Sequence, residues 1–103
     1  MGTAFNSAQA QSVSSTGTVI YTAGVGVSAT NVSLLLSNTG SSSTTATVTL
    51  TNGTNVTSVV TNLTIGIGQT QDISSKIVIK AGAYITVSSP GQVDATISVV
   101  ENS

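Results

Sequence analysis

The sequence predicts an all-β protein that forms a single β-sandwich, jelly-roll-like, with about eight short antiparallel strands. Thr, Val and Ile dominate the composition, and these β-branched residues favour a pleated, half-buried surface. Apolar residues alternate at period two in several stretches, and no stretch shows helical spacing. Turn-forming residues recur about every 8 to 12 positions, which is typical of a sandwich. A chain of 103 residues has the size of one domain.

The N-terminal residues 1–16 are small and polar, with isolated apolar positions at Phe5 and Val13. This composition predicts an extended arm that precedes the sandwich domain, which we place at residues 17–103. The first strand of the sandwich is expected at residues 18–22.

Two stretches show the plainest alternation. Residues 30–37 carry Val32, Leu34 and Leu36 at period two, so all three are expected to face the core. Residues 45–51 alternate threonine with apolar residues, which predicts one core face and one polar face. Asn52-Gly53 then supplies a tight hairpin turn, and the returning strand is expected at residues 56–63.

The C-terminal part of the chain predicts four further strands. Glycines at positions 66 and 68 mark a bend before them, and Ala81-Gly82 and Ser89-Pro90-Gly91 read as turns between them. The strands themselves are expected at residues 69–73, 76–80, 83–88 and 93–100.

Charge is nearly absent from this sequence, whereas ordinary domains are about a quarter charged. A surface with so little charge is weakly protected from self-association, which favours a protein that is covered by neighbours. With two Lys and no Arg, binding to nucleic acid or to an acidic membrane is disfavoured. The charged residues are Asp72, Lys76, Lys80, Asp94 and Glu101.

Catalytic chemistry has few candidate residues. The chain has no His and no Cys, so a hydrolytic nucleophile would have only carboxylates and lysines as partners. We interpret Asp72 and Lys76 as a solvated surface pair and Asp94 as an outward polar position. Two aspartates are too few to predict a calcium site. The sequence therefore predicts no enzyme, no cofactor, and no catalytic or metal-binding residue.

Five stretches of the chain carry a resemblance to known proteins: residues 19–22, 34–39, 67–70, 76–82 and 93–101. They resemble short Ser/Thr-rich β-sandwich virion proteins of tailed bacteriophages, of the capsid decoration or cement type and including cyanophage examples. This resemblance implies a virion structural protein that binds the outside of the phage head as a homotrimer and stabilises it. The implied partners are the major capsid protein and further copies of the chain, and the implied location is the capsid surface.

The N-terminal arm is the expected partner-binding segment, since an extended segment can add to the edge of a neighbouring sheet. Phe5 is the best anchor, with Asn6 and Val13 as the other expected contact residues. Many longer members of the family carry a proline in the turn after the first strand, where this chain has residues 22–26.

Three alternative functions remain open. One is a tail, neck or head-fibre module of the same virion. Another is a carbohydrate-binding or adhesin-like module, for which Tyr21 and Tyr84 would be the aromatic platforms. A third is an ice-binding face on the threonine ladder of residues 45–51, although the same threonines serve as the polar side of an amphipathic strand.

Overall fold

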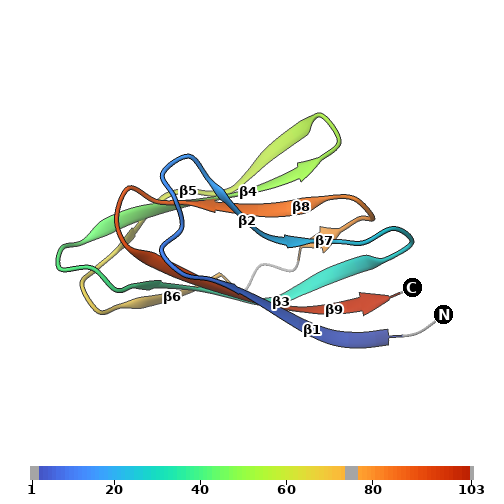
Figure 1. Ribbon diagram of the computed structural model, residues 1–103, viewed down its shortest axis with the longest axis horizontal. Helices are drawn as coiled ribbons and strands as arrows, with labels where there is room; N and C mark the ends of the chain where they lie inside the picture. The colour runs from blue at the N-terminus through green and yellow to red at the C-terminus, as the bar shows by residue number, and fades with distance from the viewer. Residues whose placement is uncertain (1–2, 74–76, 103) are drawn as a thin grey trace.

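The computed structural model describes residues 3–73 and 77–102, and the regular elements in these ranges are all β-strands. They form two sheets that pack face to face, so the predicted β-sandwich is confirmed (Figure 1). Within the described ranges no helix is long and apolar enough to cross a membrane. The strands are β1 (Thr3–Ala10), β2 (Thr18–Thr22), β3 (Ser28–Asn38), β4 (Thr44–Asn52), β5 (Asn55–Ile65), β6 (Thr70–Ile73), β7 (Val78–Ile79), β8 (Tyr84–Ser88) and β9 (Val93–Asn102).

Every strand pair in the two sheets is antiparallel. The larger sheet has the order β1-β9-β3-β6, and β7 also pairs with β3. The smaller sheet has the order β2-β8-β4-β5. The edges of the sandwich are therefore β1 and β6 with β7 in the larger sheet, and β2 and β5 in the smaller one.

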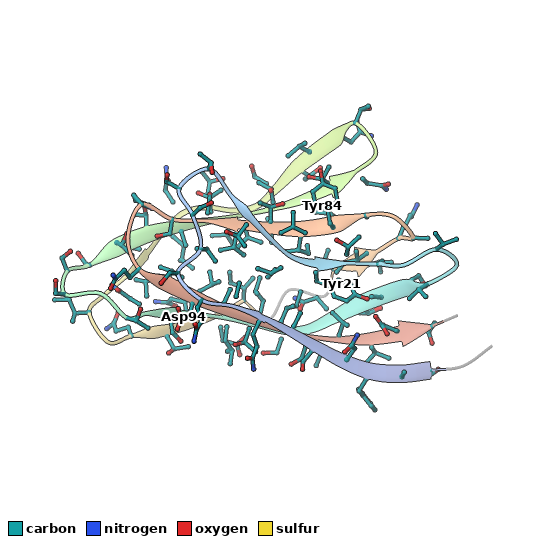
Figure 2. The ribbon with its side chains drawn as sticks, viewed as in Figure 1. Tyr21, Tyr84 and Asp94 are labelled. Atoms are coloured by element: carbon teal, nitrogen blue, oxygen red, sulfur yellow. The ribbon has the colours of Figure 1, made fainter. Side chains whose placement is uncertain are left out.

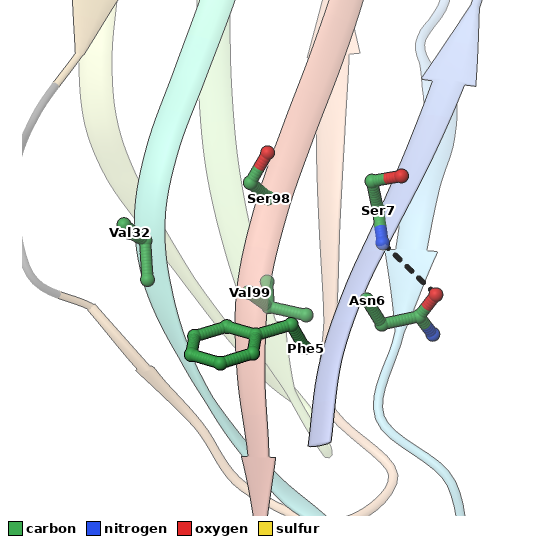
Figure 3. A pocket seen from close by; sticks show the side chains of 6 residues that line it. All are labelled: Phe5, Asn6, Ser7, Val32, Ser98 and Val99. Carbon is green, nitrogen blue, oxygen red and sulfur yellow. Dashed lines mark hydrogen bonds between the residues drawn. The ribbon is translucent and has the colours of Figure 1, made fainter.

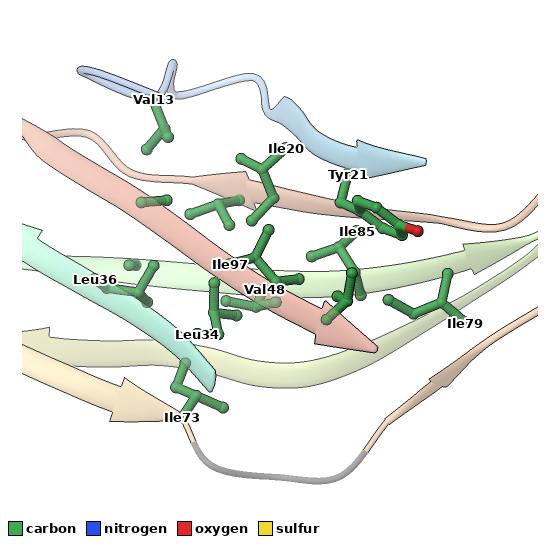
Figure 4. Close-up of a cluster of buried hydrophobic side chains, with 14 of the residues drawn as sticks. Val13, Ile20, Tyr21, Leu34, Leu36, Val48, Ile73, Ile79, Ile85 and Ile97 are labelled. Atoms are coloured by element: carbon green, nitrogen blue, oxygen red, sulfur yellow. The ribbon is translucent and has the colours of Figure 1, made fainter. Parts of the chain in front are cut away.

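The core lies between the two sheets and consists almost entirely of aliphatic side chains (Figure 4). Alternation places every second residue of β8 and β9 inward, as the period-two patterns predict. The largest fully buried apolar side chains are Leu34, Leu36, Val48, Ile65, Ile79, Ile85, Val87, Val93, Ile97 and Val99.

The N-terminal segment differs from the expected arm outside the sandwich. All eight residues of β1 pair with β9, from Thr3 opposite Asn102 to Ala10 opposite Ala95. The inner face of β1 carries Ala8 and Ala10, which pack against the core. These small side chains give a faint hydrophobic alternation, because alanine contributes little apolar surface.

The bulge in β3 overturns one predicted core position. The register with β9 shifts between Asn31 and Ser33, so Val32 is an extra residue in its strand. Leu34 and Leu36 face the core as predicted, but Val32 is 54% exposed. The bulge inverts the phase of the alternation, and Asn31 takes the inward position that Val32 was expected to hold.

The β4–β5 hairpin is confirmed, with its turn one residue further along the chain than predicted. Asn52 pairs with Asn55, which leaves Gly53 and Thr54 as the two loop residues. Gly53 has a φ of 64°, the conformation that a type II′ turn requires at its first central position. The Ala81-Gly82 turn is also confirmed, with Gly82 at a φ of 83° and the Ala83 N–H bonded to the Lys80 carbonyl.

Candidate interaction surface

The described acidic side chains do not gather at one site. Among the described residues, no three His, Cys, Asp or Glu side chains lie close enough together to hold a metal ion. Asp72 is exposed on β6, and its expected partner Lys76 lies outside the described residues. Asp94 points outward from β9 as predicted, and its carboxylate accepts a hydrogen bond from the Ser12 N–H (2.9 Å).

The four-stranded sheet carries no charged residue on any of its strands. Its outer face is rich in hydroxyl groups, because Thr49 lies between Thr86 of β8 and Ser58 of β5. Two register shifts between β4 and β5 interrupt this array, and Thr51 is buried rather than presented to solvent. The face is polar and uncharged, but it lacks the regular rows that the ice-binding alternative requires.

The most exposed aromatic side chain in the described chain lies on the outer face of the larger sheet. Phe5 is 85% exposed, and its ring extends from β1 across β9 toward Val32 of β3 (Figure 3). Phe5 and Val32 form opposite walls of a shallow hollow of about 340 Å³ that is open to solvent. We call it the Phe5 hollow; its lining residues are Phe5, Asn6, Ser7, Val32, Ser98 and Val99.

Strand register and the β3 bulge together build this hollow. Antiparallel pairing places Phe5 opposite Val100, so both side chains emerge on the outer face. The extra residue in β3 turns Val32 to the same face, where regular pairing would have buried it. Val100 is in turn opposite Thr30, which is opposite the exposed Val78 of β7. Phe5, Val100, Thr30 and Val78 thus form a row across the outer face of the larger sheet, in which Thr30 is the polar member. We call this row the apolar band.

The inner side of β1 is held by Glu101 of β9. The Asn6 side-chain amide donates to the Glu101 carboxylate (3.3 Å), and the Tyr21 hydroxyl of β2 donates to the same carboxylate. Burial of Tyr21, together with its hydrogen bond to Glu101 and the negative charge there, raises the pKa of Tyr21 to about 12. This contact connects β1, β9 and β2, and therefore both sheets.

The three sequence-predicted contact residues have different positions. Phe5 and Asn6 both line the Phe5 hollow. Val13 does not join them, because it is only 3% exposed and belongs to the core, where its N–H donates to the Val93 carbonyl (2.9 Å). Its prediction as a partner contact is wrong, since a buried side chain cannot reach a partner. Val32 was missed because no glycine or proline marks the bulge in the sequence.

Comparison with known proteins identifies the fold and no family. No family model matches the chain, and no curated protein matches it in sequence. A solved structure of a Bacillus endospore appendage, from work that describes these appendages as a novel family of disulfide-linked pili, superposes with a TM-score of 0.58. The two chains are 13% identical over 98% of this chain and 88% of that one. At this identity the likeness concerns the fold alone.

Proposed function

We propose that this protein is a structural subunit of a virion, a decoration or cement protein that binds the outside of a phage head and stabilises it. The Phe5 hollow carries this proposal, because it presents an aromatic anchor and an open apolar site on an almost uncharged sandwich. A similar sandwich occurs in a Bacillus endospore appendage that is described as a pilus, and this likeness supports a structural role. Disulfide links of the kind named for that pilus are excluded here, since this chain has no Cys.

The energetic case for a partner rests mainly on Phe5. Burying about 150 Å² of a phenylalanine side chain at about 25 cal/mol per Å² contributes about 3 to 4 kcal/mol. Aromatic anchors that enter a pocket of the partner commonly dominate an interface. The major capsid protein is the proposed partner, and burial of Phe5 and Val32 against it would cover the most exposed part of the apolar band.

Serine substitutions in the Phe5 hollow test whether it binds the particle. We expect Phe5→Ser and Val32→Ser to weaken binding of the purified protein to heads that lack it, with at least about a tenfold loss for Phe5→Ser. Val25→Ser is the control, because Val25 is a fully exposed apolar residue that lies in the β2–β3 loop, away from the hollow. Equal binding by all three variants would refute a role for this hollow.

The copy number per particle tests the location. Quantitative mass spectrometry of purified virions should give hundreds of copies, near the number of major capsid subunits. A few dozen copies or fewer would instead support the tail, neck or head-fibre alternative. Absence from virions would refute the virion proposal.

The carbohydrate-binding alternative loses one of its two expected platforms. Tyr21 is 7% exposed and its hydroxyl is bound to Glu101, which leaves Tyr84 on the outer face of β8 (Figure 2). A glycan array with wild type and Tyr84→Ala tests what remains of this alternative. The homotrimer also stays a prediction, and a mass measurement in solution distinguishes it from the contact proposed below.

A further inference from the structure

Three of the four sheet edges carry features that hinder pairing with another strand. The β2 edge has five residues and a register shift between Val19 and Tyr21. The β5 edge has two register shifts and a residue with positive φ, Asn62. The β6 and β7 edge consists of strands of four and two residues, with the charged Asp72 exposed. Short strands, bulges and charges are the means by which proteins block edge-to-edge association.

The β1 edge has none of these features. Its eight residues pair with β9 in unbroken register and include no charge and no proline. The first five, from Thr3 to Ser7, are all exposed, and within the described ranges no strand lies beyond β1. Apart from the Ser7 N–H, which the Asn6 side chain binds, the backbone groups on this side of β1 have no neighbouring strand among the described residues and can extend the larger sheet.

We propose that β1 pairs with β1 of a second copy of this chain, antiparallel about a two-fold axis. A second copy offers the same uninterrupted edge, whereas the other edges of the molecule are hindered. In a two-fold contact both copies use the same edge, so the dimer is closed and neither β1 strand remains unpaired. The uncharged residues of β1 add no repulsion between the copies.

Pairing of this kind would also bring two Phe5 hollows together. With the two-fold axis perpendicular to the sheet, the outer faces of both copies lie on the same side of one continuous sheet. Phe5, Ser7 and Gln9 project from this face of each β1. The pair would thus present a doubled apolar surface, although the pairing itself does not depend on the proposed virion function.

The Asn6 side chain already occupies this edge in the single molecule. Its Oδ1 accepts a hydrogen bond from the Ser7 N–H (2.9 Å; Figure 3), while its Nδ2 donates to Glu101 of β9. Pairing would replace this local bond with a backbone carbonyl of the second copy. The Ser7 N–H therefore has an acceptor both in the single molecule and in the pair, so pairing leaves this donor satisfied.

Single-cysteine variants test the proposal directly, because the natural chain has no Cys. Thr3→Cys, Phe5→Cys, Ser7→Cys and Gln9→Cys are each oxidised in purified protein, and covalent dimer is measured on a non-reducing gel. About a two-fold axis, the distance between identical residues grows by roughly 7 Å for each residue from the axis. A disulfide needs Cα atoms within about 7 Å. Covalent dimer should therefore peak at one of these positions, or equally at two neighbouring ones, and fall steeply at the positions further from the axis.

Edge positions on the hindered strands provide the controls. Thr22→Cys on β2 and Thr61→Cys on β5 are both exposed and should give little covalent dimer. Equal cross-linking at the control positions, or none anywhere on β1, would overturn the proposal. Cross-linking that appears only when a β1 variant is mixed with a β5 variant would also overturn it, because the contact would then be head-to-tail.

A lysine substitution tests the same contact without covalent chemistry. Pairing along the whole of β1 would place the axis close to Asn6 and Ser7, so Ser7→Lys brings two positive charges together. Its dissociation constant in sedimentation experiments should rise by at least about tenfold, and the dimer should therefore form only at correspondingly higher protein concentrations. Thr61→Lys should leave the dissociation constant unchanged. An unchanged Ser7→Lys dimer would contradict the proposal. Both measurements use purified protein, so they can fail while the virion tests succeed, or the reverse.

Discussion

At the scale of single residues, the buried Asn38 side chain joins the loop between β3 and β4 to the end of β5. Its amide donates to the carbonyls of Ser42 (2.9 Å) and Ile65 (3.0 Å), and its Oδ1 accepts from the Gly40 N–H (2.9 Å). Asn38 is only 3% exposed, so water cannot easily replace these partners.

Asn38→Ala should lower the free energy of unfolding by about 2 to 4 kcal/mol, because it removes a side chain that satisfies three backbone groups. Urea denaturation followed by circular dichroism measures this change. Asn52→Ala is the control, since Asn52 is exposed at the end of β4 and should cost less than about 1 kcal/mol. Equal losses for the two variants would show that the Asn38 contacts contribute little.

A second prediction at this scale concerns the hydroxyl of Tyr21. Its pKa is raised from 10.0 to about 12 in the folded protein, so the folded state retains a proton that the unfolded state releases. This stabilisation is fully present below about pH 10 and is lost as the pH rises through about 12. The free energy of unfolding should therefore fall across this range in wild type, and it should fall less steeply in Tyr21→Phe.

Tyr84→Phe is the matched control for this pH dependence, because it keeps the contact between Tyr21 and Glu101. It should follow the wild-type curve. The assigned role of Tyr21 would be wrong if all three proteins lost stability in parallel between pH 10 and pH 12.

At the scale of elements, most strands could be predicted from the sequence, because apolar and polar residues alternate wherever strand pairing is regular. The expected strand at residues 18–22 coincides with β2, and those at 83–88 and 93–100 lie close to β8 and β9. The failures lie where pairing with a partner strand decides the structure. β1 depends on the open edge of β9, and the phase change in β3 depends on its register with β9, so neither is encoded locally.

The β3 bulge predicts different stability losses for substitutions at Leu34 and Val32, whereas a strand without the bulge would bury both side chains. Leu34→Ala should destabilise the protein by about 2 to 5 kcal/mol, because a fully buried leucine leaves a cavity. Val32→Ala should cost less than about 1 kcal/mol, because Val32 is 54% exposed. Thermal unfolding of the two variants compares them, and a larger loss for Val32→Ala would place the bulge elsewhere in β3.

At the scale of the whole molecule, composition predicted a surface with little charge but did not predict where a binding site would lie on it. A net charge of −1 and five charged residues indicated a protein that tolerates close neighbours. Phe5 and Asn6 were identified because one aromatic residue stands out in a polar segment. The hollow itself could not be predicted, since it requires Val32 of β3 to lie beside β1 residues that are distant in sequence.

The absence of charge on β1 makes the proposed self-association nearly independent of salt. Salt acts by screening charges, and the Debye length falls from about 14 Å at 0.05 M to about 4 Å at 0.5 M. Over this range we expect the wild-type dissociation constant, measured by sedimentation, to change by less than about threefold. Ser7→Lys should behave differently: screening weakens the repulsion between its two lysines, so its association should strengthen as salt rises. A wild-type dissociation constant that rises tenfold with salt would mean that Asp94, Glu101 or another charged group, and not the β1 edge, holds the copies together.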